Sequence, residues 1–268
     1  MDDFFNPKTI VKENFKIAII YTTERIGSNK TKYIQAKVYF DLNGKILIKK
    51  IFYNGKAATI IEYKRNSNGL IKLKTRHSMD SLENKSDFMS PEIEDFEYEN
   101  SLNLIKVKKR DHRGNIVPDN MTEYTKYEYD KLNRVIREYR YAYYEANSVS
   151  SYDQNFEYLT NGDSKSITLD NGVPWMLTIS KYNSNSRLIS QVDYDMPNSK
   201  MLTEEHYKYN ESNQMISFSV TQKNGSGING CPENDNYSEN YTYDSKKLLD
   251  RIIHRFQNVI CEMEVKYE

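Results

Sequence analysis

The stretch YEYDKLNRVIREYRY, residues 127–141, decides the fold. Tyr127 and Tyr129 alternate with polar residues, which is the pattern of one face of a β-strand. Asp130 can open a tight turn by accepting hydrogen bonds from nearby backbone N–H groups, and Asn133 can adopt the positive φ that a short loop needs. The residues after this turn alternate again. The stretch therefore predicts a β-hairpin.

The same pattern recurs along the chain. It consists of an aromatic residue (the anchor), Asp or Asn, two variable residues, a Gly or polar residue, one further residue and an aliphatic residue. Clear copies are VYFDLNGKIL (38–47), FEYENSLNLI (96–105), SKYNSNSRLI (180–189), YKYNESNQMI (207–216) and YTYDSKKLL (241–249); degenerate copies are IEYKRNSNGLI (61–71), FEYLTNGDS (156–164) and RDHRGNIV (110–117). Asn54-Gly55 and Asn171-Gly172 add two further hairpin-turn signals. Recurrence of this kind predicts a repetitive antiparallel hairpin meander.

This repeat resembles the YD repeats of the Rhs family over about residues 38–267. The resemblance implies a strip of β-hairpins, which in that family coils into a shell around a toxin. The present chain is short and has no toxin-like C-terminal domain, so we predict an all-β, open, twisted or partly curled sheet. We expect one domain, 1–268, in which residues 1–37 cover the repeats of 38–268 as strands or as a short helix.

Composition bears on the class of partner. The chain has 38 basic and 38 acidic residues, and this balance argues against nucleic-acid binding. No apolar stretch reaches the ~18 residues of a membrane helix. The first residues, MDDFFNPK, place acids before any base, unlike a secretory signal. We therefore predict a cytoplasmic protein without a membrane or nucleic-acid partner.

No motif indicates catalysis, a cofactor or a metal. Cys231 and Cys261 have no metal-type spacing, and free thiols are favoured over one long-loop disulfide. Residues 225–230 match GxGxxG, but the following Cys-Pro cannot readily begin the helix which that motif requires, so a loop is favoured. The four histidines, His77, His112, His206 and His254, are widely spaced and predicted to be surface or sheet-face residues.

Charge runs and insertions suggest how strands and loops are arranged. The acidic run EIEDFEYE (92–99) and the basic run IKVKKRDHR (105–113) predict cross-strand ion pairing, with a docking site as the alternative. Extra residues at 78–95, 145–154 and 221–240 are predicted to form loops along one edge of the sheet. These loops would form a binding surface or be merely tolerated insertions.

The candidate binding residues are aromatic. A platform for a protein or a sugar is one interpretation and structural packing is the other, since Tyr offers large contact area at low entropy cost. The candidates are Tyr127, Tyr129, Tyr139, Tyr141, Tyr143 and Trp175.

We therefore expect a protein that binds rather than catalyses. The resemblance to YD-repeat systems implies an immunity protein that neutralises a bacterial toxin. A carbohydrate-binding or cell-surface adhesion module is the alternative, and an enzyme with scattered carboxylates is a third possibility. Unpaired edge strands would favour a homodimer.

Overall fold

The computed structural model describes residues 5–26, 29–53, 55–79, 90–99, 102–144, 148–222, 236–256 and 259–268. These residues form antiparallel strands, with a short helix α1 (Pro7–Lys12) and a 3-10 turn (Asp119–Met121). The strands are β1 (Ile17–Ile26), β2 (Asn29–Phe40), β3 (Ile46–Tyr53), β4 (Lys56–Arg65), β5 (Ile71–Ser78), β6 (Glu92–Glu99), β7 (Asn103–Lys109), β8 (Tyr124–Tyr129), β9 (Val135–Tyr144), β10 (Ser148–Tyr158), β11 (Ser164–Asp170), β12 (Val173–Tyr182), β13 (Leu188–Asp195), β14 (Lys200–Tyr209), β15 (Met215–Gln222), β16 (Asn236–Tyr243), β17 (Leu249–Phe256) and β18 (Val259–Tyr267). The all-β prediction is confirmed.

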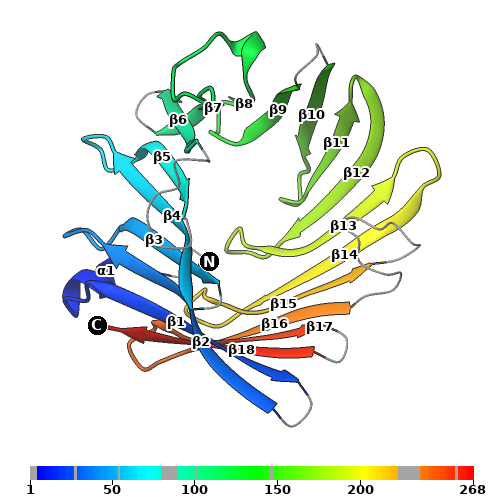
Figure 1. The fold of residues 1–268 in the computed structure, drawn as a ribbon. Coiled ribbons are helices and arrows are strands. Elements are labelled where there is room, and N and C mark those ends of the chain that lie inside the picture. The colour runs from blue at the N-terminus through cyan, green and yellow to red at the C-terminus, as the bar shows by residue number, and fades with distance from the viewer. Residues whose placement is uncertain are drawn as a thin grey trace. The chain divides into compact units, whose positions relative to one another are not determined.

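The predicted open or partly curled sheet is wrong, because the strand order closes on itself. Each strand pairs with its neighbours in the chain, and β1 also pairs with β18, with Ala18 opposite Tyr267. Figure 1 shows blue β1 beside red β18. The strands therefore form one 18-stranded antiparallel sheet whose first and last strands pair with each other. The first strand, expected only to cover the repeats, supplies the partner that the last strand needs, so the edges expected to form a homodimer are paired within the chain.

The turns have the predicted chemistry. Asp41 Oδ1 accepts hydrogen bonds from the backbone N–H groups of Asn43 and Lys45, at 2.8 and 2.9 Å, and Gly44 has a φ of 71°. The same oxygen-to-fourth-residue bond forms at Asn66, Asp111, Asp130, Asn183, Asn210 and Asp244. A positive φ three residues after each of these is found at Gly69, Gly114, Asn133, Ser186, Asn213 and Lys247. The degenerate copies at 61–71 and 110–117 therefore make the same turn as the clear copies that contain these bonds.

Four anchor tyrosines bind their repeat to the one before it. The hydroxyl of an anchor donates a hydrogen bond to the backbone carbonyl of the aliphatic residue in the preceding repeat, a contact we call the tyrosine latch. The latches join Tyr129 to Leu104 and Tyr158 to Val135, each at 2.8 Å, Tyr209 to Leu188 at 2.9 Å, and Tyr267 to Leu249 at 3.2 Å. Phe cannot make this bond, which gives a physical reason for Tyr at these four anchors.

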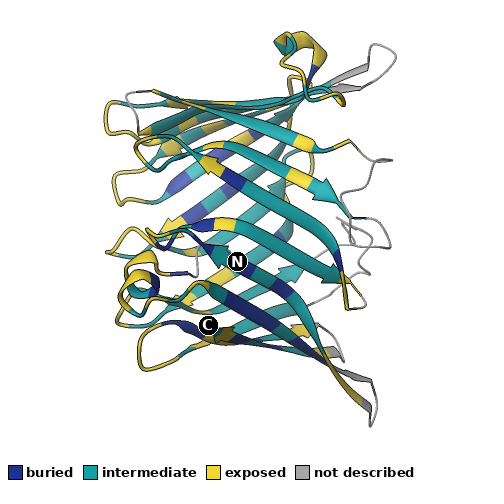
Figure 2. Ribbon diagram, turned by 60° about the vertical axis from the view of Figure 1, so that its left-hand side comes forward, coloured by how far each residue is buried: buried dark blue, intermediate teal, exposed yellow. Residues whose placement is uncertain are grey.

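Contacts divide the chain into two compact units. Unit 1 comprises residues 1–95, 110–116 and 239–268, and unit 2 comprises residues 96–109 and 117–238. Unit 1 has an apolar core on one face of its strands, with Ala18, Ile20 and Val38 fully buried. Figure 2 shows this burial along the strands near both chain ends.

Helix α1 is fitted against the core of unit 1. Asn6 caps the helix by accepting from the N–H of Lys8 at 3.1 Å, and Phe5 packs edge-to-face on Phe40 with ring centroids 5.3 Å apart. A Cβ on Gly44 would lie 2.4 Å from the carbonyl oxygen of Pro7, so this turn needs glycine for both its φ and its contact with the helix. The N-terminal segment thus contains a helix and a strand that is an integral part of the sheet.

Unit 2 buries hydroxyl groups. The buried polar residues on its strands β11, β12 and β14 are Ser164, Ser166, Thr168, Thr178, Ser180 and Thr203. The register places Ser164 opposite Ser180 and Ser166 opposite Thr178, so these side chains share one face of the sheet, which we call the hydroxyl face. Buried hydroxyl groups are stable on such a face only where they form hydrogen bonds.

The charge runs pair differently from the simple prediction. Asp95 and Arg110 join the acidic and basic runs, with 2.7 Å between Oδ2 and Nε. Glu94 of the acidic run pairs with Lys74 on β5 at 2.8 Å. Lys106 and Lys108 of the basic run pair with Asp119 in the 3-10 turn, with Nζ 2.8 and 2.9 Å from Oδ1. Cross-strand ion pairing is thus present, spread over more elements than the two runs.

The insertions are shorter than predicted. Residues 92–95 and 148–154 belong to β6 and β10, and residues 236–240 belong to β16. The residues 80–89, 145–147 and 223–235 lie outside the described part of the chain, as do Asn54, Cys231 and the GxGxxG match. The predicted loop-rich edge is wrong for these strand residues, because their backbone continues the ladder.

Replacing a latch tyrosine by phenylalanine should destabilise the protein. Tyr158→Phe keeps the ring but leaves the carbonyl of Val135 without its donor, so the free energy of unfolding should fall by about 1 kcal/mol in urea titration. Tyr53→Phe is the matched control, since that side chain is 73% exposed and should change stability little. Equal losses in the two variants would contradict a role for the latch.

Stability should also fall in alkali. Burial raises the pKa of latch tyrosines such as Tyr158 and Tyr209 above the ordinary value near ~10, and raises the pKa of the anchor Tyr243 to about 12. Because the folded pKa is raised, these groups contribute fully below about pH 10, and the contribution is lost as pH rises through their folded values. The free energy of unfolding measured in urea should therefore be constant from pH 8 to about 10 and should fall above pH 10. The absorbance of tyrosinate in the folded protein should rise at a higher pH than that of free tyrosine. Complete tyrosinate formation in the folded protein near pH ~10 would contradict the raised pKa values of the buried tyrosines.

Candidate functional site

Cross-strand register brings polar and aromatic residues together on the hydroxyl face of β9–β12. Gln154 on β10 lies opposite Glu138 on β9 and opposite Thr168 on β11. Thr168 in turn lies opposite Met176 on β12, and Tyr152 lies opposite Arg140. Side chains directly opposite each other on one face are neighbours, so four successive strands contribute to one surface.

A β-bulge adds Trp175 to this surface. Thr168 pairs with Met176 and Leu169 pairs with Pro174, which leaves Trp175 as the extra residue of β12. Consecutive residues of a regular strand point to opposite faces, yet Trp175 and Met176 line the same pocket. Bulges re-aim side chains in this way, and proline is tolerated beside them because the ladder is already interrupted.

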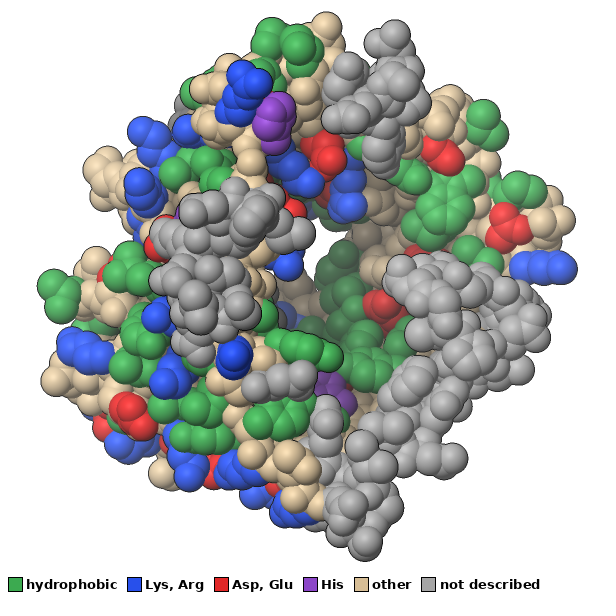
Figure 3. All heavy atoms as spheres, viewed as in Figure 1, with side chains coloured by type: hydrophobic (Ala, Val, Ile, Leu, Met, Phe, Trp, Pro, Cys, Tyr) green, Lys and Arg blue, Asp and Glu red, His purple; other side chains and the backbone are tan. Residues whose placement is uncertain are grey.

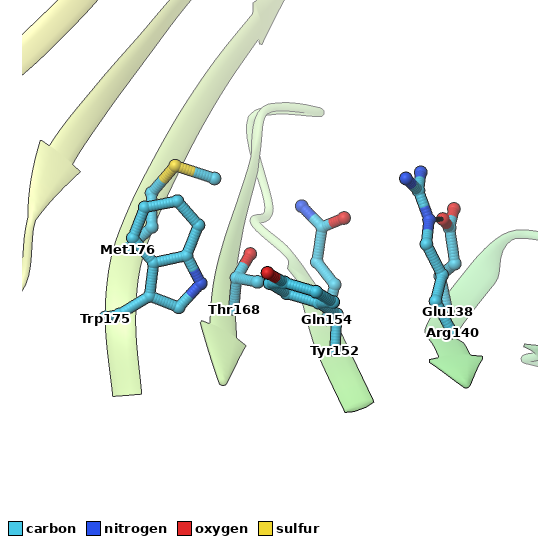
Figure 4. A pocket seen from close by; sticks show the side chains of 7 residues that line it. All are labelled: Glu138, Arg140, Tyr152, Gln154, Thr168, Trp175 and Met176. Carbon is cyan, nitrogen blue, oxygen red and sulfur yellow. Dashed lines mark hydrogen bonds and ion pairs between the residues drawn. The ribbon is translucent and has the colours of Figure 1, made fainter. Parts of the chain in front are cut away.

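The surface contains a pocket of about 280 Å³, wholly within unit 2. Its lining is formed by Glu138, Arg140, Tyr152, Gln154, Thr168, Trp175 and Met176, drawn in Figure 4. In that view the indole of Trp175 and the ring of Tyr152 lie on either side of Thr168, and the indole nitrogen is on the side turned toward Thr168. The pocket therefore combines aromatic walls with polar atoms between them.

Two of these polar atoms are buried without a hydrogen-bond partner. They are Thr168 Oγ1 and Trp175 Nε1. Thr168 as a whole is only 7% exposed. Leaving such groups unsatisfied costs roughly 1–3 kcal/mol each, so a molecule in the pocket that hydrogen-bonds to them would remove this cost.

The remaining polar groups of the pocket are paired within the protein. Gln154 Nε2 donates to Ser166 Oγ at 2.9 Å, which leaves the amide oxygen of Gln154 as an acceptor. Arg140 Nε donates to Glu138 Oε1 at 2.5 Å. The Arg140 side chain is 65% exposed whereas that of Glu138 is 16% exposed, so the ion pair extends from the sheet into solvent.

The structure divides the predicted aromatic platform. Tyr127 lies opposite Glu138, on the hydroxyl face, and its pKa is raised first by burial and then by the charge of Glu138. Tyr139 and Tyr141 lie on the opposite face, and Tyr129 uses its hydroxyl in a latch. The backbone of Tyr143 is in β9, but its side chain lies outside what the structure describes. Of the six predicted residues, Trp175 lines the pocket.

On the opposite face, tyrosines pack among charges. Tyr124 stacks on Tyr141 with centroids 5.1 Å apart, and Lys126 lies over the Tyr124 ring at 4.9 Å. Hydrogen bonds from Lys106 and Lys108 hold the pKa of Asp119 well below its usual range. Here the tyrosines and the charges satisfy each other, which favours packing over an open platform. Figure 3 likewise shows basic and acidic side chains interspersed over one face of the molecule.

Neither a metal-ligand cluster nor a helix that could span a membrane is found among the described residues. They contain no group of three or more His, Cys, Asp or Glu side chains able to hold a metal ion. Three predicted sheet-face histidines lie near glutamates, with distances of 3.4 Å for His77–Glu62, 3.2 Å for His206–Glu204 and 2.8 Å for His254–Glu239. None of the described helices has the length and hydropathy to span a bilayer.

Comparison with known proteins gives distant likenesses. No family model and no curated protein matches the sequence. Similar solved structures include the Tc holotoxin pore of Photorhabdus luminescens, 12% identical with a TM-score of 0.34, over 88% of this chain and 13% of that one. A porin-like protein of Bacteroides uniformis is 11% identical with a TM-score of 0.45, over 95% of this chain and 98% of that one. A porin-like protein of Bacteroides vulgatus is 11% identical with a TM-score of 0.32, over 92% and 97%. These likenesses indicate no activity.

Sequence reasoning found Trp175 but missed the rest of the pocket. The sequence gives no motif for the other lining residues, which come from the four strands β9 to β12: Glu138, Arg140, Tyr152, Gln154, Thr168 and Met176. One local signal was present, since Pro174 follows the Asn171-Gly172 turn inside a strand and therefore marks an interrupted ladder.

Removing the unsatisfied hydroxyl should not harm the free protein. Thr168→Val keeps the side-chain shape and eliminates a buried hydroxyl without a partner, so the free energy of unfolding should rise by about 1 kcal/mol. Thr178→Val is the matched control, because Thr178 Oγ1 donates to Asp193 at 2.7 Å, and its loss should cost about 1.5–3 kcal/mol. Chemical denaturation of both variants measures the difference, and a destabilised Thr168→Val would mean that Thr168 is satisfied in the free protein.

Proposed function

We propose that this chain is a non-enzymatic carbohydrate-binding protein whose sugar-binding site is the Trp175 pocket. The observation that carries the proposal is the pair of buried, unpartnered polar atoms, Thr168 Oγ1 and Trp175 Nε1, between aromatic walls. A bound hydroxyl group can accept from the indole N–H and can donate to or accept from the threonine. Binding would then satisfy two groups that the free protein leaves unsatisfied.

The aromatic walls suit the other surface of a sugar. A pyranose ring has faces formed by C–H groups, and these can be buried against the flat rings of Trp175 and Tyr152 while the hydroxyls meet polar atoms. Small-molecule sites typically have volumes from ~300 Å³ upward, apolar walls and a few polar groups. At about 280 Å³ the pocket suits one sugar ring, or the end of a longer glycan. Met176 has a flexible side chain, so this wall can adjust on binding.

We also infer that the chain is a degenerate member of the YD-repeat type. Support comes from the turn bonds and the tyrosine latches, which recur at the positions of the sequence repeat. The toxin-neutralising role that this resemblance implies stays a prediction. Location separates the two functions, because a glycan-binding role requires contact with glycans outside the cytoplasm, whereas a toxin-neutralising role suits the predicted cytoplasmic location.

Binding can be measured through the protein's own fluorescence. Trp175 is the sole tryptophan of the chain, so its emission reports directly on the pocket. A glycan array should identify a ligand, and titrating that glycan should change the emission. Tyr152→Ala removes one wall and should weaken binding tenfold or more, which corresponds to about 1.4 kcal/mol.

The control for this variant is Tyr53→Ala, whose exposed ring lies in unit 1 and should leave binding unchanged. Thr168→Val should weaken binding while retaining the folded state. A glycan that binds without altering Trp175 emission and equally to all variants would exclude the pocket. The absence of binding to any glycan, with a stable complex formed instead with a toxin, would favour the neutralising role.

A further inference from the structure

We infer that the pocket selects neutral saccharides over charged ones, and that Glu138 determines this selectivity by occupying Arg140. This inference rests on the proposed function. Among the described residues that line the pocket, Arg140 is the one cation and Glu138 the one anion. Their ion pair gives the lining no net charge.

The ion pair is built into one strand. Residues 138 and 140 are two apart on β9 and therefore point to the same face. Arg140 Nε and Glu138 Oε1 are 2.5 Å apart, so the pair is already formed in the absence of a ligand. Glu138 is the less exposed of the two, which makes its carboxylate the fixed partner and the guanidinium the group at the rim.

Charged sugars meet a penalty at this site. The carboxylate of a uronic acid would have to displace Glu138 from Arg140, or lie beside the Glu138 carboxylate and repel it. An amino sugar would have to displace Arg140 from Glu138 in the same way. In both cases the ligand gains one ion pair and breaks another, while it also loses its own hydration.

The unpartnered atoms also favour neutral hydroxyls. The indole N–H of Trp175 can only donate, the hydroxyl of Thr168 can do both, and the amide oxygen of Gln154 can accept. A sugar hydroxyl both accepts and donates hydrogen bonds. Adjacent hydroxyls of one sugar can therefore accept from the indole N–H, bond to the threonine hydroxyl and donate to the amide oxygen. A carboxylate only accepts and an ammonium only donates, so each would leave part of this set unsatisfied.

Replacing Glu138 should change the specificity. In Glu138→Gln the guanidinium of Arg140 is released beside the aromatic walls, and it can then bind a carboxylate with charge-assisted hydrogen bonds. The ratio of the affinity for glucuronic or galacturonic acid to the affinity for the matching neutral hexose should rise at least tenfold over the wild type. Titration followed by Trp175 emission measures both, and thermal unfolding verifies that the variant is folded.

The chain offers a matched control on the same strand. Arg137 lies on the opposite face of β9 and pairs with Glu128, with Nη1 and Oε1 3.1 Å apart. Glu128→Gln therefore removes an ion pair of the same strand away from the pocket, while Asp153 still holds Arg137 at 2.6 Å, and it should leave every sugar affinity unchanged. The double variant Glu138→Gln with Arg140→Gln removes both charges and should lose the gained uronate binding.

The outcomes separate this inference from the proposed function. Wild-type protein that prefers uronates or amino sugars to neutral ones would overturn the selectivity while supporting carbohydrate binding. An unchanged ratio of uronate to neutral-hexose affinity in folded Glu138→Gln, or an equal gain in Glu128→Gln, would overturn the role of Glu138. No glycan binding and no change of Trp175 emission would overturn the proposed function itself.

Discussion

The hydrogen bond from an anchor tyrosine to the carbonyl of the preceding repeat is the contact on which the regularity of this sheet depends. Backbone ladders hold neighbouring strands at a fixed distance, but they allow a strand to slip by two residues without changing faces. The latch removes that freedom, because only one register brings the hydroxyl of Tyr158 to Val135 or that of Tyr209 to Leu188. The Asp or Asn turn fixes the other end of each hairpin. Together they let a chain with a mean hydropathy of −0.82 form a long sheet without an apolar core along its whole length.

Local chemistry of this kind is visible in the sequence, and closure is not. Each hairpin needs residues only a few positions apart, such as Asp130 and Asn133, so the repeat pattern predicted the strands and the turns. Pairing of β1 with β18 joins residues at opposite ends of the chain, and β1 (IAIIYTTERI) carries no copy of the repeat. Nothing in its composition distinguishes a covering strand from one that pairs on both edges. The open-sheet prediction failed at that non-local step.

The same distinction explains the predicted tyrosines. Tyr139 and Tyr141 are two residues apart on β9 and therefore share a face. The register of β8 against β9 decides which residues of β8 share that face. It places Glu138, not Tyr139, opposite Tyr127. The aromatic ladder therefore divides between two faces. The pocket was harder still to predict, because its lining comes from four strands whose residues match no motif and meet only through their pairing.

The hydroxyl face shows why a site arises where it does. Elsewhere on this face polar groups are mutually satisfied: Ser166 accepts from Gln154, and Thr178 and Thr203 both donate to Asp193 at 2.7 Å. Thr168 lies at the position where the register of β11 and β12 shifts, and there the extra residue, Trp175, takes the space beside it. The indole brings an apolar wall and a further donor but no acceptor for itself or for the threonine. One irregularity of the backbone thus produces the aromatic wall and leaves the two polar atoms without a protein partner, so the ladder defect and the pocket have a common origin.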